Sequence, residues 1–240
     1  MAARSGVGSF TLVDPETLAP ENIGRHILPR DSVGVAKAEG VRRAILAVNP
    51  SATVEAVVAK FEDLATRPDL VVAATDSFAG DSLINDYSLR EGVPAVYGGC
   101  WGAASVGEIL YVVPGKTPCY ECYAGFRREA VHLPQDPRKY TDPDFDATKV
   151  PGQAGLWANI LIITAVMFQV VVALVDPESE RRRLIDFERT LLLFNVSSYD
   201  CGLQPLAVTF GKVKKGCAVC DESRLEELGK GLPDVMPNDR

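Results

Sequence analysis

The sequence predicts an α/β fold with a mostly parallel, doubly wound sheet that carries helices on both faces. Short apolar stretches alternate with segments of helical periodicity over the first half of the chain. Residues 69–74 form an almost continuous apolar run, which is typical of a parallel strand buried on both faces. The length of 240 residues suits one large domain of this class.

Strands and helices alternate in the N-terminal half. The expected strands span residues 9–14, 53–58, 69–74, 93–98 and 105–113. The expected helices span residues 34–48, 55–66 and 79–91, so the short strand at 53–58 and the second helix overlap at their boundary. The first helix is well marked, because Val41, Ala44, Ile45 and Val48 share one face and Asn49-Pro50 stops it. A polar loop with three prolines precedes it at residues 15–33.

The C-terminal half has a different pattern. Residues 123–152 are rich in charge, proline and aspartate and have no periodicity, so we expect a flexible crossover loop there. A strand pair near residues 189–196 and 205–210 predicts an antiparallel C-terminal extension of the sheet. Residues 221–240 are expected to form a polar tail, which leaves a single domain over residues 1–220.

Composition and charge exclude several classes of protein. The net charge of −7 argues against a nucleic-acid binder, which usually carries a basic face. The chain opens without the charged and apolar segments of a secretory signal. Hydrophobic residues make up 47% of the chain, enough to bury a substantial core. We therefore expect a folded cytoplasmic protein.

One long apolar segment requires a choice between a membrane span and a buried helix. Residues 156–175 contain no charged side chain and have the length of a bilayer span. Asn159, Thr164 and Gln169 interrupt the segment, and no basic residues flank its N-terminal side. These features favour a helix buried in the protein, without a membrane. A helix that is apolar all round also favours a subunit interface, so we expect a homodimer.

Two matched cysteine pairs predict a metal site. Cys119 and Cys122 form one Cys-x-x-Cys pair, and Cys217 and Cys220 form the other. Four thiolates suit a closed, tetrahedral structural zinc site, and each two-residue spacer lets one turn supply two ligands. A redox pair and ordinary buried cysteines are the alternatives. The remaining cysteines, Cys100 and Cys201, are expected to be small buried residues.

A row of polar residues follows the first and third expected strands. Asp14 and Asp76 each end an apolar stretch, and Asn22, Arg25 and Lys37 lie between them. Acids at strand ends can hold ribose hydroxyls or Mg²⁺, and cations can hold phosphates. Taken one at a time, the acids are equally consistent with caps of a turn or a helix, and the cations with solvated charges. The combination predicts a nucleotide site.

Several motifs in this order resemble the ThiF/MoeB/HesA family of the ubiquitin-activating enzyme superfamily. The stretch from Asp14 to His26 resembles the family's "D-x-D/E … s-N-l-x-R-Q", and the stretch from Asp31 to Lys37 resembles "d-v-G-x-x-K". Residues 69–85 resemble "D-l-V-l-D-a-T-D-n-f … l-N", with Ala73 and Ser77 as departures. The first cysteine pair resembles the family's "C-Y-x-C". The likeness covers residues 4–220 and implies a Rossmann-like fold.

The resemblance also implies an activity and a set of roles. The family adenylates a carboxylate with ATP and releases pyrophosphate, typically at the C-terminus of a small ubiquitin-like or sulfur-carrier protein. Carried over by position, Asp14 would hold the ribose, and Asn22, Arg25 and Lys37 would face the phosphates. Asp76 would coordinate Mg²⁺, and Zn²⁺ would sit on the four cysteines. No cysteine lies in residues 123–152, so we expect no thioester step.

In the family, a strand and a glycine-rich ATP turn precede the motif that resembles residues 3–8 (Ala-Arg-Ser-Gly-Val-Gly). We expect this chain to begin after that turn. Two functions therefore stay open: an adenylyltransferase, or a catalytically inactive partner subunit or scaffold of an adenylating heterodimer. A nicotinamide-dependent oxidoreductase is a third alternative, but it leaves Arg25 and Lys37 without a role.

Overall fold

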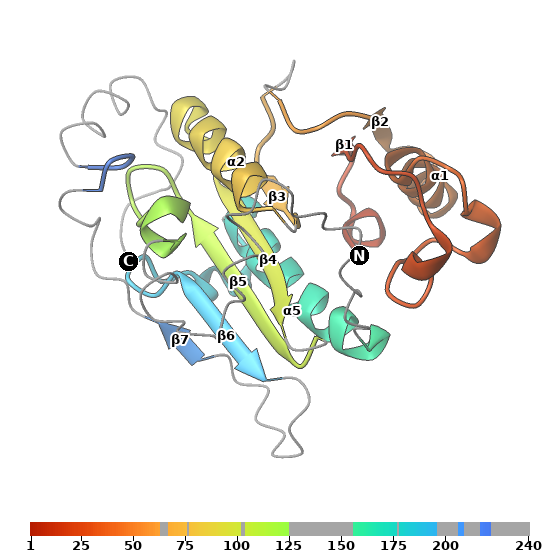
Figure 1. Ribbon diagram of the computed structural model, residues 1–240. Helices are drawn as coiled ribbons and strands as arrows, with labels where there is room; N and C mark the ends of the chain where they lie inside the picture. Colours follow the sequence, from red (N-terminus) through yellow and green to blue (C-terminus); the bar gives the residue numbers. More distant parts are fainter. Residues whose placement is uncertain are drawn as a thin grey trace.

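The computed structural model describes residues 1–62, 67–75, 77–101, 104–124, 156–176, 178–195, 206–208 and 217–221. These residues form a two-stranded and a five-stranded sheet (Figure 1). Of the predicted crossover loop at residues 123–152, Tyr123 and Ala124 are helical and buried, and the remainder lies outside the described residues. The predicted tail at residues 221–240 lies outside them apart from Asp221, as do Asp76 and Cys201.

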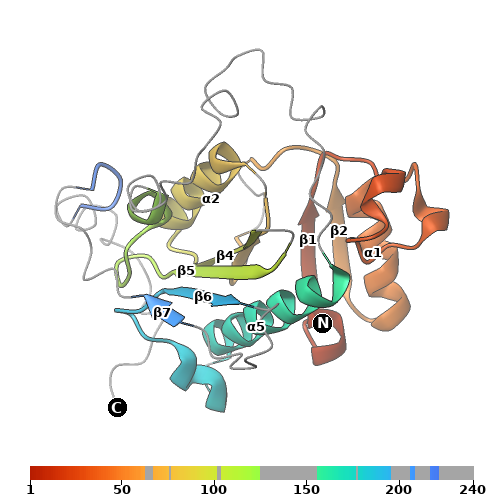
Figure 2. The ribbon, with the colours of Figure 1, turned by 60° about the horizontal axis from the view of Figure 1, so that its bottom comes forward.

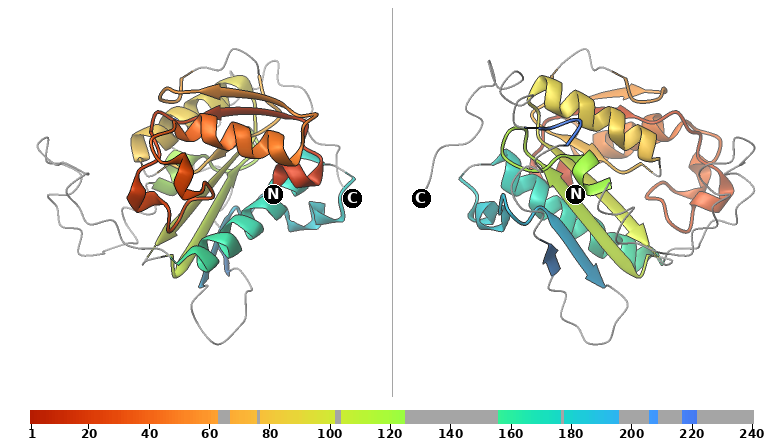
Figure 3. Two further views of the ribbon diagram at one scale, coloured as in Figure 1. Left: turned by 90° about the vertical axis from the view of Figure 1, so that its right-hand side faces the viewer. Right: turned by 60° about the vertical axis from the view of Figure 1, so that its left-hand side comes forward.

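The N-terminal unit is a parallel strand pair covered by one helix. Its elements are η1 (Ala2–Ser5), β1 (Ser9–Val13), η2 (Pro20–Asn22), η3 (Arg30–Ser32), α1 (Lys37–Val48) and β2 (Thr53–Val57). β1 and β2 pair from Ser9 opposite Thr53 to Val13 opposite Val57. Figure 3 shows α1 lying along one face of this pair.

Two elements of this unit differ from the sequence-based prediction. α1 begins at Lys37 and not at residue 34, because Gly34 and Val35 bond to Leu18 across the loop. The helix predicted near 55–66 is wrong for its described part. Residues 53–57 are a strand, because their β-branched residues pair with β1, and residues 58–62 are irregular.

The main sheet has the order β3-β4-β5-β6-β7. Its elements are β3 (Val71–Ala73), α2 (Phe78–Glu91), β4 (Ala95–Trp101), β5 (Val106–Val112), α5 (Trp157–Val175), η5 (Glu180–Leu184), β6 (Leu191–Asn195) and β7 (Leu206–Val208). β3 and β4 are parallel, and each later pair is antiparallel. The predicted antiparallel extension is confirmed, and it starts already at β5. α2 and α5 cover opposite faces of the sheet (Figure 2).

Two apolar clusters follow from the alternation of side chains along β4 and β5. Tyr97 and Val112 lie in the cluster beneath α2, whereas Val96, Ile109 and Tyr111 lie in the cluster beneath α5. Ile109 and Val112 are fully buried, and each side chain of this kind contributes about 1.5–3 kcal/mol to folding. The core therefore belongs to the main sheet and supports what lies at its edges.

α5 packs on the sheet through one side only. Ile163, Val170 and Ala173 are buried against it, and a Cβ at Gly98 would lie 2.5 Å from the sulfur of Met167. On other parts of the helix, Leu161 is 37% exposed and Val175 is 42% exposed. By length and composition, α5 is the single described helix that could cross a membrane, which is weak evidence by itself. The expected packing on the core is confirmed for one face, and the described residues leave the remaining apolar surface of α5 uncovered.

β3 differs from its prediction at one residue. Strands in a parallel sheet are normally covered on both faces, yet the described residues leave Val72 46% exposed. The prediction that residues 69–74 are buried on both faces therefore fails at Val72. The flanking Val71 and Ala73, which lie beneath α2, are buried.

Candidate functional site

The two cysteine pairs converge at one end of the main sheet. Their four sulfur atoms lie within 4.8 Å of one another. The Sγ of Cys119 lies 3.9 Å from that of Cys122 and 4.0 Å from that of Cys217, and the Sγ atoms of Cys122 and Cys220 lie 3.4 Å apart. Each pair forms its own turn, because Cys122 N–H donates to the Cys119 carbonyl and Asp221 N–H donates to the Cys217 carbonyl.

These separations fit zinc and do not fit disulfides. Ligands about 2.3 Å from a tetrahedral Zn²⁺ lie roughly 3.8 Å apart, whereas a disulfide needs about 2.05 Å. All four thiols are free, and all but Cys217 are buried. Hydrogen bonds among the thiols lower the pKa of Cys122, which accepts from Cys119, and raise the pKa of Cys119. The convergence of four sulfurs is what a closed metal site requires.

α2 holds the first cysteine turn from the side. The Oδ1 of Asn85, which is fully buried, accepts a hydrogen bond of 2.9 Å from Tyr120 N–H. The Ser82 hydroxyl bonds to the carboxylate of Glu121. Two residues between the paired cysteines are therefore fixed to α2, which the spacing of the cysteines alone did not predict.

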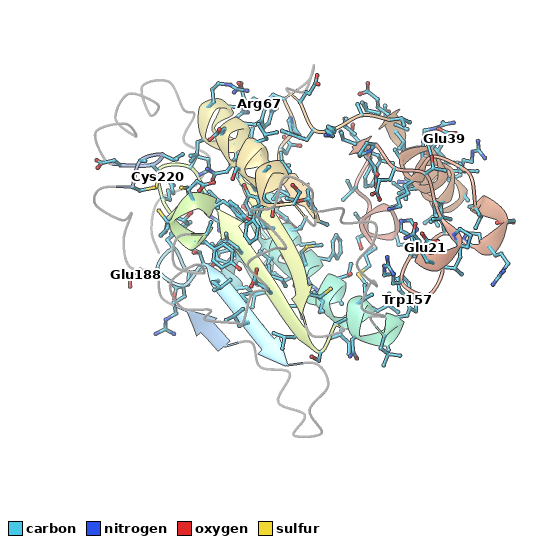
Figure 4. All side chains as sticks on the ribbon, in the orientation of Figure 1. Glu21, Glu39, Arg67, Trp157, Glu188 and Cys220 are labelled. Carbon is cyan, nitrogen blue, oxygen red and sulfur yellow. The ribbon has the colours of Figure 1, made fainter. Side chains whose placement is uncertain are left out.

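A second polar cluster lies at the end of β1, far from the cysteines. Figure 4 shows Glu21 and Glu39 of the N-terminal unit on the opposite side of the molecule from Cys220. Asp14 directly follows β1, and its Oδ1 accepts a 2.8 Å hydrogen bond from Glu16 N–H. Lys37 is the first residue of α1, and its ammonium pairs with the Glu16 carboxylate. Its backbone N–H also donates to the Glu16 carbonyl at 2.9 Å.

The structure thus brings Asp14 and Lys37 together through Glu16, a residue that the sequence analysis did not select. The hydrogen bond from Glu16 N–H confirms that Asp14 caps a turn, which was one of the roles that the sequence left open for it. The Lys37 side chain is only 14% exposed, whereas that of Glu16 is 65% exposed. An anion that binds Lys37 can therefore displace the Glu16 carboxylate into solvent at a small cost in free energy.

The loop between Asp14 and Lys37 is anchored by two buried leucines. Leu18 is 1% exposed and Leu28 is 3% exposed. Leu28 packs on α1 at Gly40, where a Cβ would lie 2.5 Å from its Cδ1, so any larger residue at this position would force the Leu28 side chain to shift. Leu28 N–H donates to His26 Nδ1 at 3.2 Å. Partial burial and nearby Lys37 lower the pKa of His26.

Asn22 and Arg25 occupy the same loop but bond within it. Asn22 Oδ1 accepts from Ala19 N–H at 3.0 Å, and Arg25 Nη1 donates to the Glu21 carbonyl at 3.3 Å. The Arg25 side chain is exposed. The loop therefore presents both predicted phosphate-facing residues on the same unit as Asp14 and Lys37.

The turn between β3 and α2 is the third predicted element. Its described residues are Thr75, whose hydroxyl bonds to Asp81 Oδ1 at 2.8 Å, and Ser77, whose Oγ accepts from Gly80 N–H. Ser77 is the N-cap of α2, so this position is not filled by Asp76. Asp81, in the first turn of α2, is an additional acid that the motif comparison missed.

The prediction for Cys100 is wrong. This residue is exposed and not buried. Its side chain points to the same sheet face as Gly98, which Met167 of α5 contacts. Partial desolvation raises the pKa of the Cys100 thiol, which disfavours the nucleophilic thiolate.

Together, the fold and the two sites define a doubly wound α/β protein with a strand-end polar cluster and a four-cysteine clamp. Comparison with known proteins gives the family. The ThiF family model matches residues 1–214, and the chain belongs to this family.

Related proteins share moderate identity with the chain. It is 26% identical over 232 residues to the SAMP-activating enzyme E1 of Haloferax volcanii, covering 94% of this chain and 76% of the relative. It is 32% identical over 130 residues to the sulfur carrier protein ThiS adenylyltransferase of Bacillus subtilis, covering 51% of this chain and 38% of the relative. The molybdopterin-synthase adenylyltransferase of Escherichia coli is 32% identical over 127 residues, covering half of each chain.

Solved structures of E. coli MccB share the fold. The complex with AMPCPP and MccA superposes with a TM-score of 0.68 at 21% identity, over 91% of this chain and 60% of MccB. The complex with ATP has the same TM-score at 20% identity and the same coverage. The chain therefore spans 60% of the MccB chain, and the likeness confirms the predicted Rossmann-like architecture.

Proposed function

We propose that this protein is an ATP-dependent adenylyltransferase that activates a carboxylate. The substrate is the C-terminus of a ubiquitin-like or sulfur-carrier protein. A carboxylate oxygen attacks the α-phosphorus of ATP, the bond to the bridging β-oxygen breaks, and pyrophosphate leaves as an acyl-adenylate forms. The family match over residues 1–214 carries this proposal, because its relatives include adenylyltransferases and a carrier-activating enzyme.

The residues of the β1 end supply what the reaction needs. In the proposal, Asp14 holds the ribose hydroxyls, and Asn22, Arg25 and Lys37 face the phosphates. Negative charge accumulates on the leaving pyrophosphate, so cations placed in advance stabilise the transition state. Arg25, Lys37 and Asp76 are the proposed catalytic residues, and Asp76 is the proposed ligand of Mg²⁺, which would neutralise phosphate charge. No step uses a side-chain nucleophile.

Zinc has a structural role in this proposal. Cys119, Cys122, Cys217 and Cys220 would hold it, and four protein ligands leave no position for a substrate. The clamp joins the turn beside α2 to the chain beyond β7, at a distance from the β1 end (Figure 4). Zinc therefore supports the fold and takes no part in adenylation.

We further propose a cytoplasmic homodimer that binds neither nucleic acid nor membrane. The uncovered apolar residues of α5, among them Leu161 and Val175, supply the contact between subunits. The net charge of −7 supports solubility and disfavours nucleic acid. The pKa of the exposed Cys100 thiol is raised, which disfavours the thiolate that a thioester step would need. This agrees with a reaction that stops at the adenylate.

ATP–pyrophosphate exchange tests the activity. Exchange that depends on a carrier protein, and that is lost in Lys37→Ala, supports the enzyme. Arg43→Ala is the matched control, because Arg43 also lies on α1 but pairs with Glu39. The alternative function is an inactive partner subunit or scaffold, in which the ion pair between Lys37 and Glu16 would persist in the presence of ATP. Absence of exchange together with stable pairing to a catalytic homologue would establish that alternative.

A further inference from the structure

Side chains of the N-terminal loop alternate between solvent and α1 over residues 25–28. The first and third of these residues are exposed, whereas His26 is half-buried and Leu28 is buried. Leu28 packs on α1 at Gly40, and Lys37 lies three residues earlier on the same face of that helix. His26 points to the same side of the loop as Leu28, which brings its ring toward Lys37.

The charges that act on His26 belong to the proposed nucleotide site. Burial lowers the pKa of His26 most, the Lys37 ammonium of α1 lowers it further, and the Asp14 carboxylate after β1 raises it. The ring therefore lies within electrostatic range of both the residue proposed for the phosphates and the residue proposed for the ribose. A pKa below the ordinary value of 6.5 keeps the imidazole neutral at pH 7.

The backbone determines which ring nitrogen carries the proton. Leu28 N–H donates to His26 Nδ1 at 3.2 Å, so Nδ1 is the acceptor of the neutral ring. The proton then lies on Nε2, which becomes a donor. This Nε2–H has no hydrogen-bond partner in the part of the chain that the structure describes. A half-buried donor of this kind is available to a ligand.

The surroundings of this donor favour an anion. α1 begins at Lys37, and its N-cap Ala36 supplies no side-chain hydrogen bond to the first turn. A helix N-terminus attracts negative charge through its free N–H groups and its dipole. The present partner of Lys37 is the exposed carboxylate of Glu16, which an anionic ligand can displace. The helix terminus, the ammonium and the imidazole therefore all suit the same kind of ligand.

We propose, on the basis of the nucleotide site proposed above, that His26 is a phosphate-binding residue whose neutral Nε2–H donates a hydrogen bond to a phosphate oxygen of ATP beside Lys37. The two residues act differently. The Lys37 ammonium is a point charge, whereas the imidazole N–H has a fixed direction. The hydrogen bond from Leu28 holds the ring in the donating tautomer before the nucleotide arrives.

Two substitutions separate the roles of the two ring nitrogens. Asparagine can accept from the N–H two residues ahead, as in an Asx turn, but it has no atom at the position of Nε2. Glutamine is long enough to keep an N–H donor near that position. We expect His26→Asn to weaken binding of AMPCPP with Mg²⁺ by about 10- to 100-fold in calorimetric titration, which is the loss of one hydrogen bond to a charged group. His26→Gln should lose less affinity than His26→Asn.

Amide hydrogen exchange at Leu28 reports on the loop separately from binding. The Leu28 amide should stay protected in His26→Asn, which keeps the acceptor, and should exchange faster in His26→Gln. The two readouts are therefore expected in opposite order. If His26 only held the loop, the variant that frees the Leu28 amide would also be the variant that loses more affinity.

An affinity of His26→Asn equal to that of wild type, or an equal or larger loss in His26→Gln, would overturn the proposal. Lys37→Ala separates the role of His26 from the proposed function. Weaker binding in Lys37→Ala with unchanged binding in His26→Asn overturns the contact from His26 and leaves the nucleotide site in place. Absence of AMPCPP binding to wild type overturns both. Weaker binding in His26→Asn without any ATP–pyrophosphate exchange in wild type supports the contact and contradicts adenylation.

Discussion

Removing one zinc ligand gives a direct measure of what the cysteine clamp contributes. Cys122→Ser replaces a buried thiol with a hydroxyl that is a poor zinc ligand. The clamp joins Cys119 to Cys217, which are 98 positions apart in the chain. In the chain-entropy model, a cross-link over a loop of about 100 residues stabilises by about 4.7 kcal/mol at 25 °C. For a domain of this size, this loss corresponds to a decrease in Tm of about 10–20 °C.

The assay combines metal content with calorimetry. We expect wild type to bind one zinc per chain, and Cys122→Ser to bind none and to unfold at the lower temperature. Cys100→Ser is the control, because this exposed cysteine lies outside the cluster. The reasoning is refuted if Cys122→Ser keeps its zinc, or if its Tm equals that of Cys100→Ser.

Three further predictions address the β1 end and α5. Glu16→Gln removes the ion pair with Lys37, so it should tighten binding of an ATP analogue by up to about fivefold in calorimetric titration, because an exposed ion pair is worth about 0.2–1 kcal/mol. Glu21→Gln makes the same charge change and should leave the affinity unchanged. Weaker binding in Glu16→Gln would contradict a phosphate-binding role of Lys37. The folded-state pKa of His26 is lowered, so its contribution to stability is present above its unfolded pKa and is lost as the pH falls through the folded value. In urea denaturation between about pH 7.5 and 5.5, wild type should therefore lose more stability than His26→Gln, and parallel pH profiles would exclude this. Leu161→Glu should convert the dimer to a monomer in sedimentation. Ile27→Glu changes an exposed apolar residue of the N-terminal loop and should leave the dimer intact. A dimer in both variants would show that α5 does not form the interface.

Elements with a strong local signal were predictable from the sequence. α1 was marked by its periodicity and by Asn49-Pro50, and the four cysteines were marked by their spacing. The motif row also placed Asp14 and Lys37 in one cluster, because it combined a strand end with a helix start. These features depend on residues that are close in sequence or that have distinctive chemistry.

Features set by long-range packing were not predictable. Glu16 and Asp81 are ordinary acids in sequence, and only the folded loop shows that they bond to Lys37 and Thr75. Residues 55–57 had helical spacing, but pairing with β1 outweighed it. The exposure of Cys100 depends on which parts of the folded chain pack beside the end of β4, which no local pattern contains.

The hydrogen bonds between α2 and the cysteine turn have a thermodynamic consequence. α2 starts at the turn after β3 and contacts the cysteine turn through Ser82 and Asn85. An equilibrium that moves the first half of this helix therefore affects both the turn after β3 and the cysteine turn. If zinc loading raises nucleotide affinity by some factor, saturating nucleotide must raise zinc affinity by the same factor, since the coupling free energy belongs to both ligands. The first half of α2 would thus make zinc occupancy and nucleotide occupancy depend on each other.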